Sequence, residues 1–202
     1  MEPLAHRVRP KSMDNFVFTS ENIVLKDYID NNNIFSTLFW GPPGTGKTTL
    51  AKIVSNVLDL NFIELSAVTS GVKDLRECVE KAKNLFLFSR TKTILFVDEI
   101  HRFNKMQQDY LLPHVEKGTL TLIGATTENP AFEVNNALLS RMKVFKFEKI
   151  PEPEIKKYLF HVCQNEKIEI KEEIIDFICT ISDGDLRKSL NSLEFLSKKD
   201  NL

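Results

Sequence analysis

The eight residues from Gly41 to Thr48 read GPPGTGKT, and this pattern could bind a phosphate group. It matches the spacing G-x-x-x-x-G-K-[ST] at Gly41, Gly46, Lys47 and Thr48. Glycines let the backbone curl so that several N–H groups point at one anion. The lysine can reach β- and γ-phosphates, and the threonine hydroxyl can ligate Mg²⁺. The candidate phosphate-binding residues are Gly41, Pro42, Pro43, Gly44, Thr45, Gly46, Lys47, Thr48 and Thr49.

The residues on both sides of this loop have the patterns of a strand and a helix. The apolar run Thr37–Trp40 precedes the loop, as a buried strand would. After the loop, apolar residues recur with helical spacing at Leu50, Ile53, Val54, Val57 and Leu58. A helix that begins at the loop directs its free N–H groups and the positive end of its dipole toward the phosphates. The context therefore favours a nucleotide site over a chance glycine-rich turn.

A second pattern is the buried run Thr93–Val97, which ends in Asp98 and Glu99. A carboxylate at a strand end beside the phosphate loop can hold Mg²⁺ opposite Thr48, and we assign this role to Asp98. Glu99 would then polarise the attacking water. Apolar strands that end in acids are common, so the pair alone is weak evidence. Its place about fifty residues after the phosphate loop makes the assignment stronger.

Four further side chains are weaker candidates. Thr127 and Asn129 follow an apolar run and could touch the γ-phosphate or the water, or they could simply cap a turn. Arg141 and Arg187 could stabilise phosphate charge, although spacing alone favours solvated arginines. His101 follows Glu99 closely, and we favour a structural or surface role for it.

Strand and helix patterns alternate through most of the chain, which predicts an α/β fold with a parallel sheet covered on both faces. The five predicted strands are Thr37–Trp40, Phe62–Leu65, Thr93–Val97, Leu120–Ala125 and Val144–Phe147. Predicted helices between them include Val72–Leu85 and Asn104–Val115. After Pro151 the patterns are only helical: Glu154–Asn165, Glu172–Ser182 and Asp185–Ser197, the last capped by Asp183 or Asp185. We therefore expect a nucleotide-binding α/β domain at 1–150 and a small all-α lid at 151–202.

Composition sets the broad class. The 202 residues are 42% hydrophobic and 27% charged, as in a soluble globular protein, and the net charge of −1 gives no global signal for nucleic acid. The three cysteines, Cys78, Cys163 and Cys179, form no metal or disulfide pattern and are expected to be reduced. No apolar stretch approaches the length of a membrane span and no signal peptide is found, so we expect a cytoplasmic protein without membrane partners.

Taken together, the segments resemble the AAA+ ATPase superfamily, and within it the RarA/MgsA family of replication-associated recombination proteins, to which the Werner-helicase-interacting ATPase is related. The strings that carry the resemblance span about the whole chain. They are PLAHRVRPKSMDNFV, LFWGPPGTGKTTLA, LSAVTSGVKDLRE, ILFVDEIHRFNKMQQD, IGATTENPAFEVNNALLSR and DGDLRKSLNSLE.

The resemblance implies a DNA-dependent ATPase that acts at stalled or damaged replication forks. It implies ATP and Mg²⁺ as ligands, single-stranded or forked DNA and replication-fork proteins as partners, and association with the bacterial nucleoid. The resemblance also implies roles for single residues. Lys47 and Thr48 would contact phosphate and metal, Asp98 and Glu99 metal and water, and Thr127 would be the first sensor. Arg141 would be a finger supplied to a neighbouring subunit, Arg187 the lid sensor, and Arg9, Pro10, Phe16 and Val17 would lie beside adenine.

Two departures from the family pattern leave alternatives open. Relatives usually carry Gly-Gln after the residues that match Phe16-Val17, whereas this chain has Phe18-Thr19. Family members also continue past the lid into a region that forms a tetramer, whereas this chain ends at Leu202, so a homo-oligomer and a monomer are both open. The alternative function is a nucleotide-binding adaptor with little hydrolysis. A branch-migration motor shares the Gly-Ala-Thr-Thr strand but is disfavoured by LSAVTSGVKD.

Overall fold

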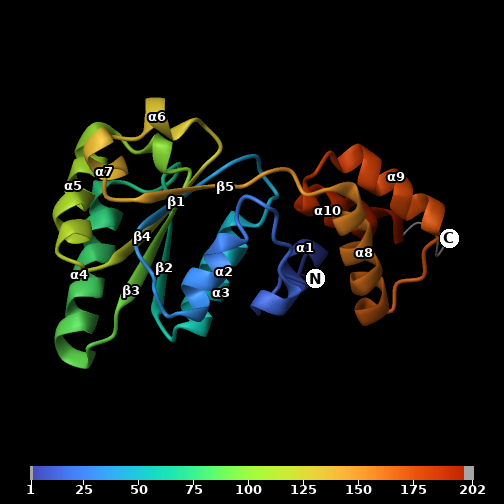
Figure 1. Ribbon diagram of the computed structural model, residues 1–202, viewed down its shortest axis with the longest axis horizontal. Coiled ribbons are helices and arrows are strands. Elements are labelled where there is room, and N and C mark those ends of the chain that lie inside the picture. Colours follow the sequence, from blue (N-terminus) through green and yellow to red (C-terminus); the bar gives the residue numbers. More distant parts are fainter. Residues whose placement is uncertain (1, 198–202) are drawn as a thin grey trace.

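The computed structural model describes residues 2–197, which form a five-stranded parallel sheet with helices on both faces and a separate group of three helices (Figure 1). The strands are β1 (Thr37–Trp40), β2 (Asn61–Ser66), β3 (Thr93–Asp98), β4 (Thr121–Thr126) and β5 (Lys143–Lys146). The helices around them are α1 (Leu4–Arg7), α2 (Val24–Asp30), α3 (Lys47–Val57), α4 (Val72–Ser89), α5 (Lys105–Glu116), α6 (Pro130–Glu133) and α7 (Asn136–Leu139), with short 3-10 helices η1 (Met13–Asn15) and η2 (Ile100–Arg102).

The strand order is β2-β3-β4-β1-β5, and each neighbouring pair is parallel. The carboxyl ends of all five strands therefore lie at the same edge of the sheet, where ligands bind in open α/β sheets. The predicted α/β fold is confirmed. Each predicted strand end lies within one residue of the observed end.

Successive residues of the central strands face opposite sides of the sheet and enter different cores. Leu38 packs with α4 and α5, whereas Phe39 packs with α2 and α3. In β3, Leu95 and Phe96 divide in the same way, and both are almost fully buried. This two-sided burial explains why the strands read as continuous apolar runs and not as alternating ones.

Three helices follow the sheet and form the lid: α8 (Glu152–Glu166), α9 (Glu172–Ser182) and α10 (Leu186–Ser197). Their apolar faces meet in a third core, to which α1 contributes the buried Leu4. Tyr158 of α8 also donates a hydrogen bond of 2.8 Å to the carbonyl oxygen of Val8. The N-terminal segment thus packs on the lid, although our proposed division at residue 150 groups it with the sheet.

Two predicted helix ends differ from the structure for local reasons. α4 runs to Ser89, four residues past the predicted end at Leu85. It ends there because the following residue, Arg90, has a left-handed backbone (φ 57°) and caps the helix. α8 begins at Glu152, before the predicted Glu154, because a proline is tolerated in the first helical turn.

All three cysteines are free thiols. In the described part of the chain, no helix combines the length and apolarity that a membrane crossing requires.

Candidate active site

The phosphate loop connects the end of β1 to the start of α3. Gly41 N donates a hydrogen bond of 3.1 Å to the carbonyl oxygen of Thr126, which joins the loop to the end of β4. Gly46 precedes α3 with a left-handed backbone (φ 93°), and a Cβ atom there would lie 2.7 Å from Cε2 of Phe16. Only glycine fits both conditions, so the sequence pattern is explained by local backbone and packing.

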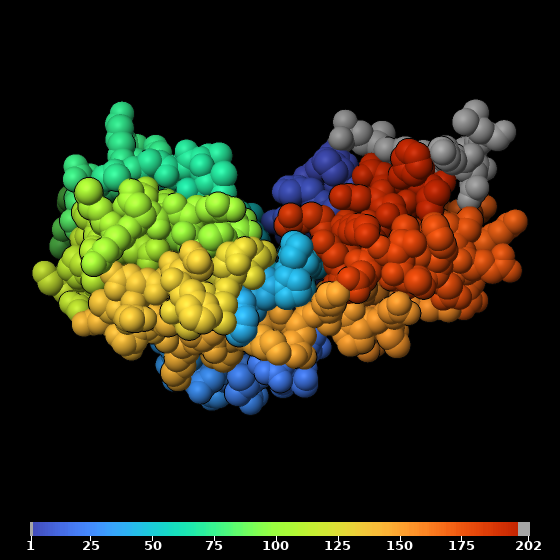
Figure 2. All heavy atoms as spheres, turned by 90° about the horizontal axis from the view of Figure 1, so that it is seen from above, coloured from blue at the N-terminus to red at the C-terminus, as the bar shows by residue number. Residues whose placement is uncertain are grey.

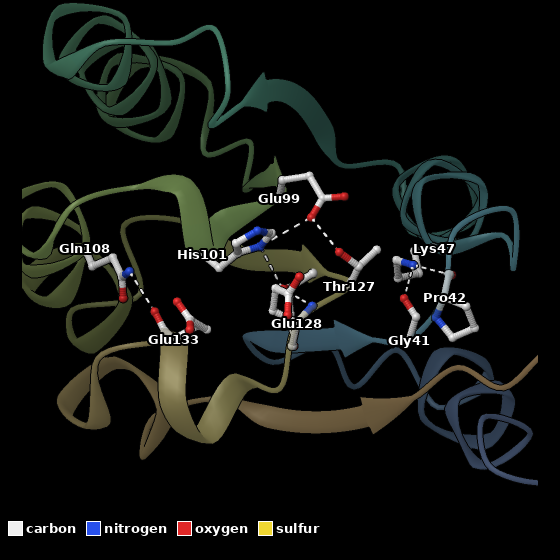
Figure 3. A network of polar contacts seen from close by, with 10 residues as sticks. Gly41, Pro42, Lys47, Glu99, His101, Gln108, Thr127, Glu128 and Glu133 are labelled. Atoms are coloured by element: carbon white, nitrogen blue, oxygen red, sulfur yellow. Dashed lines mark hydrogen bonds and ion pairs between the residues drawn. The ribbon is translucent and has the colours of Figure 1, made fainter.

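Lys47 is the first residue of α3 and is buried. Its Nζ donates hydrogen bonds of 2.7 Å to the carbonyl oxygens of Gly41 and Pro42 (Figure 3). Burial lowers the pKa of Lys47 to about 8, and the nearby carboxylates of Glu99 and Asp98 oppose this effect in part. The ammonium group is therefore poorly solvated and suited to an anionic ligand.

Asp98 and Glu99 stand where β3 ends. Burial, followed by the charge of Glu99, raises the pKa of the Asp98 carboxyl, and a bound cation would reverse that effect. Glu99 has left-handed backbone (φ 52°, ψ 47°), which is uncommon outside glycine and often marks functional sites. The chain turns here into η2, with a hydrogen bond of 2.8 Å from Arg102 N to the Glu99 carbonyl oxygen.

The Glu99 side chain contacts residues from two neighbouring segments (Figure 3). Thr127, directly after β4, donates from Oγ1 to Glu99 Oε2 over 3.4 Å. His101 Nδ1 lies 3.3 Å from the same oxygen and 2.9 Å from Thr126 Oγ1. The adjacent strands β3 and β4 therefore bring the predicted water-polarising acid and the predicted first sensor together.

The lid forms the opposite wall of the site, where a hollow separates it from the sheet domain (Figure 2). Leu186 N donates a hydrogen bond of 3.2 Å to the carbonyl oxygen of Gly44. Asp185 Oδ1 accepts a hydrogen bond of 2.9 Å from Lys188 N, so Asp185 caps α10. The sequence leaves Asp183 and Asp185 as alternatives for this cap. Arg187, in the first turn of α10, lines the cavity and lies close enough to Lys47 to lower its pKa.

One cavity brings together most of the residues that the sequence suggested. Predicted residues that line it are Arg9, Pro10, Pro43, Gly44, Thr45, Gly46, Lys47, Thr48, Thr49, Asp98, Glu99, Thr127 and Arg187. The predicted residues Gly41 and Pro42 do not line it and instead accept the hydrogen bonds of Lys47. Phe16 lies against Gly46, and Val17 packs on the lid core, so neither side chain lines the cavity.

Two further candidates lie elsewhere. Asn129 accepts a hydrogen bond of 3.1 Å from Ala131 N and so caps α6. Arg141 Nη2 lies 2.5 Å from Glu116 Oε1, and its Nη1 donates to the carbonyl oxygen of Ala137 at 2.6 Å. Arg141 is not part of the cavity wall in its own chain.

Comparisons with known proteins place this geometry in a family. Residues 37–149 match the family described as "ATPase family associated with various cellular activities (AAA)", and residues 157–197 match the "RCF1/5-like, AAA+ ATPase lid domain". The chain belongs to the AAA family of ATPases. The predicted ATPase class is thereby confirmed, and AAA membership supports nucleotide binding in the cavity.

The chain is similar to several named AAA proteins. It is 44% identical to the replication-associated recombination protein A of Haemophilus influenzae, covering 96% of this chain and 46% of that protein. It is 43% identical to ATPase WRNIP1 of Dictyostelium discoideum, covering 97% of this chain and 23% of that protein. The resemblance to the replication-associated recombination family is confirmed, and the chain spans less than half the length of these relatives.

A solved structure, the Thermotoga maritima RuvB Holliday junction branch migration motor, aligns with a TM-score of 0.75 and 28% identity over 96% of this chain and 65% of that one.

The AAA cavity has residues that the sequence patterns did not identify. They are Ala5, Tyr158, Leu186 and Leu190, which line its wall from α1 and the lid. Leu186 and Leu190 belong to the predicted helix Asp185–Ser197, in which their spacing indicates only an apolar helix face, and nothing local marks Ala5 or Tyr158. Their position depends on the packing of α1 against the lid, which pairs residues from opposite ends of the chain.

The donor set fits Mg²⁺. The Thr48 hydroxyl and the Asp98 carboxylate line the same cavity, and both are hard oxygen donors. Within residues 2–197, no group of three or more His, Cys, Asp or Glu side chains could hold a metal by itself. Magnesium is usually bound by one or two protein oxygens together with substrate phosphates and water, so this sparse set agrees with Mg²⁺ held beside a nucleotide.

Proposed function

We propose that this chain hydrolyses ATP at an interface between subunits, as part of a DNA-dependent ATPase of the replication-associated recombination type. The observation that carries the proposal is one cavity that holds Lys47, Thr48, Asp98, Glu99, Thr127 and Arg187 between the sheet and the lid. These side chains supply cations for phosphates, oxygens for a metal and a carboxylate for water.

Each group has one task in phosphoryl transfer. Lys47 and Arg187 neutralise the charge of the β- and γ-phosphates, and Glu99 accepts a hydrogen bond from the attacking water and orients it in line with the bond that breaks. Thr127 contacts Glu99 and aids that orientation. Thr48 and Asp98 would hold Mg²⁺, which would supply positive charge for the phosphate oxygens. Arg141 of a neighbouring subunit would complete the site.

The DNA partner is proposed from the similar proteins, one of which is named a replication-associated recombination protein and another a Holliday junction branch migration motor. Single-stranded or forked DNA would stimulate turnover, and replication-fork proteins at the nucleoid would be the further partners. The net charge of −1 means that DNA binding must come from a local basic face of an assembly, not from the chain as a whole.

Glu99→Gln tests the hydrolytic proposal, because the amide keeps the side-chain shape but lacks the carboxylate charge. We expect ATP turnover to fall by at least ~10²-fold, the range typical for loss of a positioned catalytic base, while ATP still binds. Turnover is measured with and without single-stranded and forked DNA, and ATP affinity is measured in parallel. Lys47→Met serves as the control with weakened ATP binding. Turnover that survives Glu99→Gln would contradict the assigned role.

A second function, a nucleotide-dependent adaptor with little hydrolysis, is favoured by one observation. Arg141 is outside the cavity and pairs with Glu116 of its own chain. In that case the unaltered chain would bind ATP with negligible turnover, and Glu99→Gln would change neither binding nor turnover.

A further inference from the structure

His101 lies beside the proposed water-polarising carboxylate (Figure 3). It belongs to η2, two residues after Glu99, and only 6% of its side chain is exposed. A buried imidazole in contact with a carboxylate needs defined hydrogen bonds, because an unpaired buried polar group costs free energy. The contacts of the His101 ring therefore indicate its role in the site.

The contacts favour a proton on Nδ1 of His101. His101 Nδ1 lies 3.3 Å from Glu99 Oε2 and 2.9 Å from Thr126 Oγ1. The separation from Glu99 is an ion-pair distance, and the hydrogen bond of the ring is the one with Thr126 Oγ1. Because an ionised carboxylate can only accept, a proton on Nδ1 is the arrangement that places a positive hydrogen toward Glu99. Thr126 Oγ1 then accepts a hydrogen bond from Nδ1–H and one of 3.0 Å from Glu128 N, while its own O–H donates to the Glu128 carbonyl oxygen at 3.4 Å. Each hydrogen in this arrangement has an acceptor.

Thr126 is a rigid anchor for this hydrogen bond. It is fully buried at the end of β4, and its backbone is paired with Trp40 of β1. Its carbonyl oxygen accepts from Gly41 N at the start of the phosphate loop. Through His101, the Glu99 side chain is thus connected to the same residue that holds the phosphate loop.

Glu99 needs such an anchor. Its side chain is 31% exposed, and within residues 2–197 the one hydrogen bond that its carboxylate accepts comes from Thr127 Oγ1, at the long distance of 3.4 Å. A glutamate side chain loses substantial rotamer freedom when it is fixed. Both contacts use Oε2, and within the described residues Oε1 accepts no hydrogen bond. Oε1 is therefore the oxygen left to orient a water.

We propose that His101 is a positioning residue for ATP hydrolysis: its Nδ1–H, anchored on Thr126, faces Glu99 Oε2 and attracts it toward the end of β4, which leaves Oε1 to orient the attacking water. The inference rests on the proposed function, since it concerns the same cavity. It replaces the structural or surface role that the sequence alone favoured for His101.

The test compares His101→Asn with His101→Leu. Asn places its Nδ2 donor where Nδ1 stands, whereas Leu has a similar volume and no donor. We expect His101→Leu to lower kcat by about tenfold to a hundredfold, as small misplacements of catalytic groups do, with ATP affinity unchanged within about twofold. His101→Asn should restore most of kcat. Full kcat in the Leu variant, or equal losses in both variants, would overturn the proposal.

A second measurement separates this inference from the proposed function. If the unaltered chain hydrolyses no ATP, the proposed function fails, and an imidazole ¹⁵N NMR spectrum then decides whether His101 holds Glu99 at all. Loss of one signal in His101→Asn assigns it among the four histidines. We expect the Nδ1–H tautomer and a clear shift in Glu99→Gln. An Nε2–H tautomer, or a signal unmoved by Glu99→Gln, would refute the contact.

Discussion

At the scale of single residues, the burial of Lys47 predicts how ATP binding depends on pH. Its pKa is lowered to about 8 from an ordinary value of 10.5. Phosphate charge in contact with the ammonium would raise the pKa again. ATP binding above pH 8 must therefore take up a proton, and affinity should fall as the pH rises, by at most about tenfold per pH unit.

Calorimetry of ATP binding between pH 7 and 9, in buffers of different ionisation enthalpy, measures this proton uptake. The phosphates of ATP are already ionised in this range, and burial raises the pKa of Tyr158, which also lines the cavity, to about 12. In Lys47→Met the titrating group is absent, so the residual affinity should not change with pH. If the ATP affinity of the unaltered chain stayed constant from pH 7 to 9, the prediction would be contradicted.

The residue scale also shows what a sequence can predict about this site. The phosphate loop and the Asp98-Glu99 pair are local patterns, in which residue type and spacing already state the chemistry. The contact between His101 and Thr126 joins residues 25 positions apart and depends on β3 lying beside β4. Phe16 is a similar case, because its ring packs against Gly46. Such pairs become visible only when the packing of the elements is known.

At the scale of elements, the start of α10 docks on the phosphate loop. Gly44 has a left-handed backbone (φ 70°), and a Cβ atom there would lie 1.7 Å from Asp185 Oδ1. Gly44→Ala should therefore push the lid away and lower ATP affinity, with a strain of about 1–3 kcal/mol for the backbone alone. The measurements are ATP affinity and hydrogen exchange of the Leu186 amide, which donates to Gly44 in the docked lid.

A double-mutant cycle separates lid contact from backbone strain. Asp185→Ser keeps an oxygen that can cap α10 but has a shorter side chain. In that background Gly44→Ala should cost less, because the clash is reduced while the backbone strain remains. If the two substitutions add within about 0.5 kcal/mol, Gly44 and Asp185 are independent and the docking contact does not matter.

The positions of the helices and strands were largely predictable from the sequence, but the way in which they pack together was only partly predictable. Helical spacing of apolar residues predicted α8 to α10, and continuous apolar runs predicted the strands. The packing of α1 on the lid was not predicted, because a four-residue helix carries little periodic signal. Its attachment rests on contacts such as the 2.9 Å hydrogen bond from Leu4 N to Glu194 Oε2, which spans 190 positions.

At the scale of the whole molecule, the proposed shared site depends on Arg141, which does not line the cavity of its own chain. Its ion pair with Glu116 is well exposed on both sides (39% and 46%), and such pairs contribute about 0–1 kcal/mol. A neighbouring phosphate could therefore replace Glu116 at small cost. We expect turnover to rise with protein concentration and Arg141→Ala to lower it by ~10³-fold or more, with ATP affinity retained.

Mixing two inactive variants tests the sharing directly. Arg141→Ala keeps Glu99, and Glu99→Gln keeps Arg141, so a mixed assembly contains interfaces where one variant supplies the arginine and the other the carboxylate. Turnover should reappear on mixing, although neither variant is active alone. Glu116→Gln is the matched control and should not lower the rate, because it removes only the charge of the carboxylate that pairs with Arg141 within the chain. If mixing restores nothing and the rate of Arg141→Ala equals that of the unaltered chain at every concentration, the site is complete within one subunit.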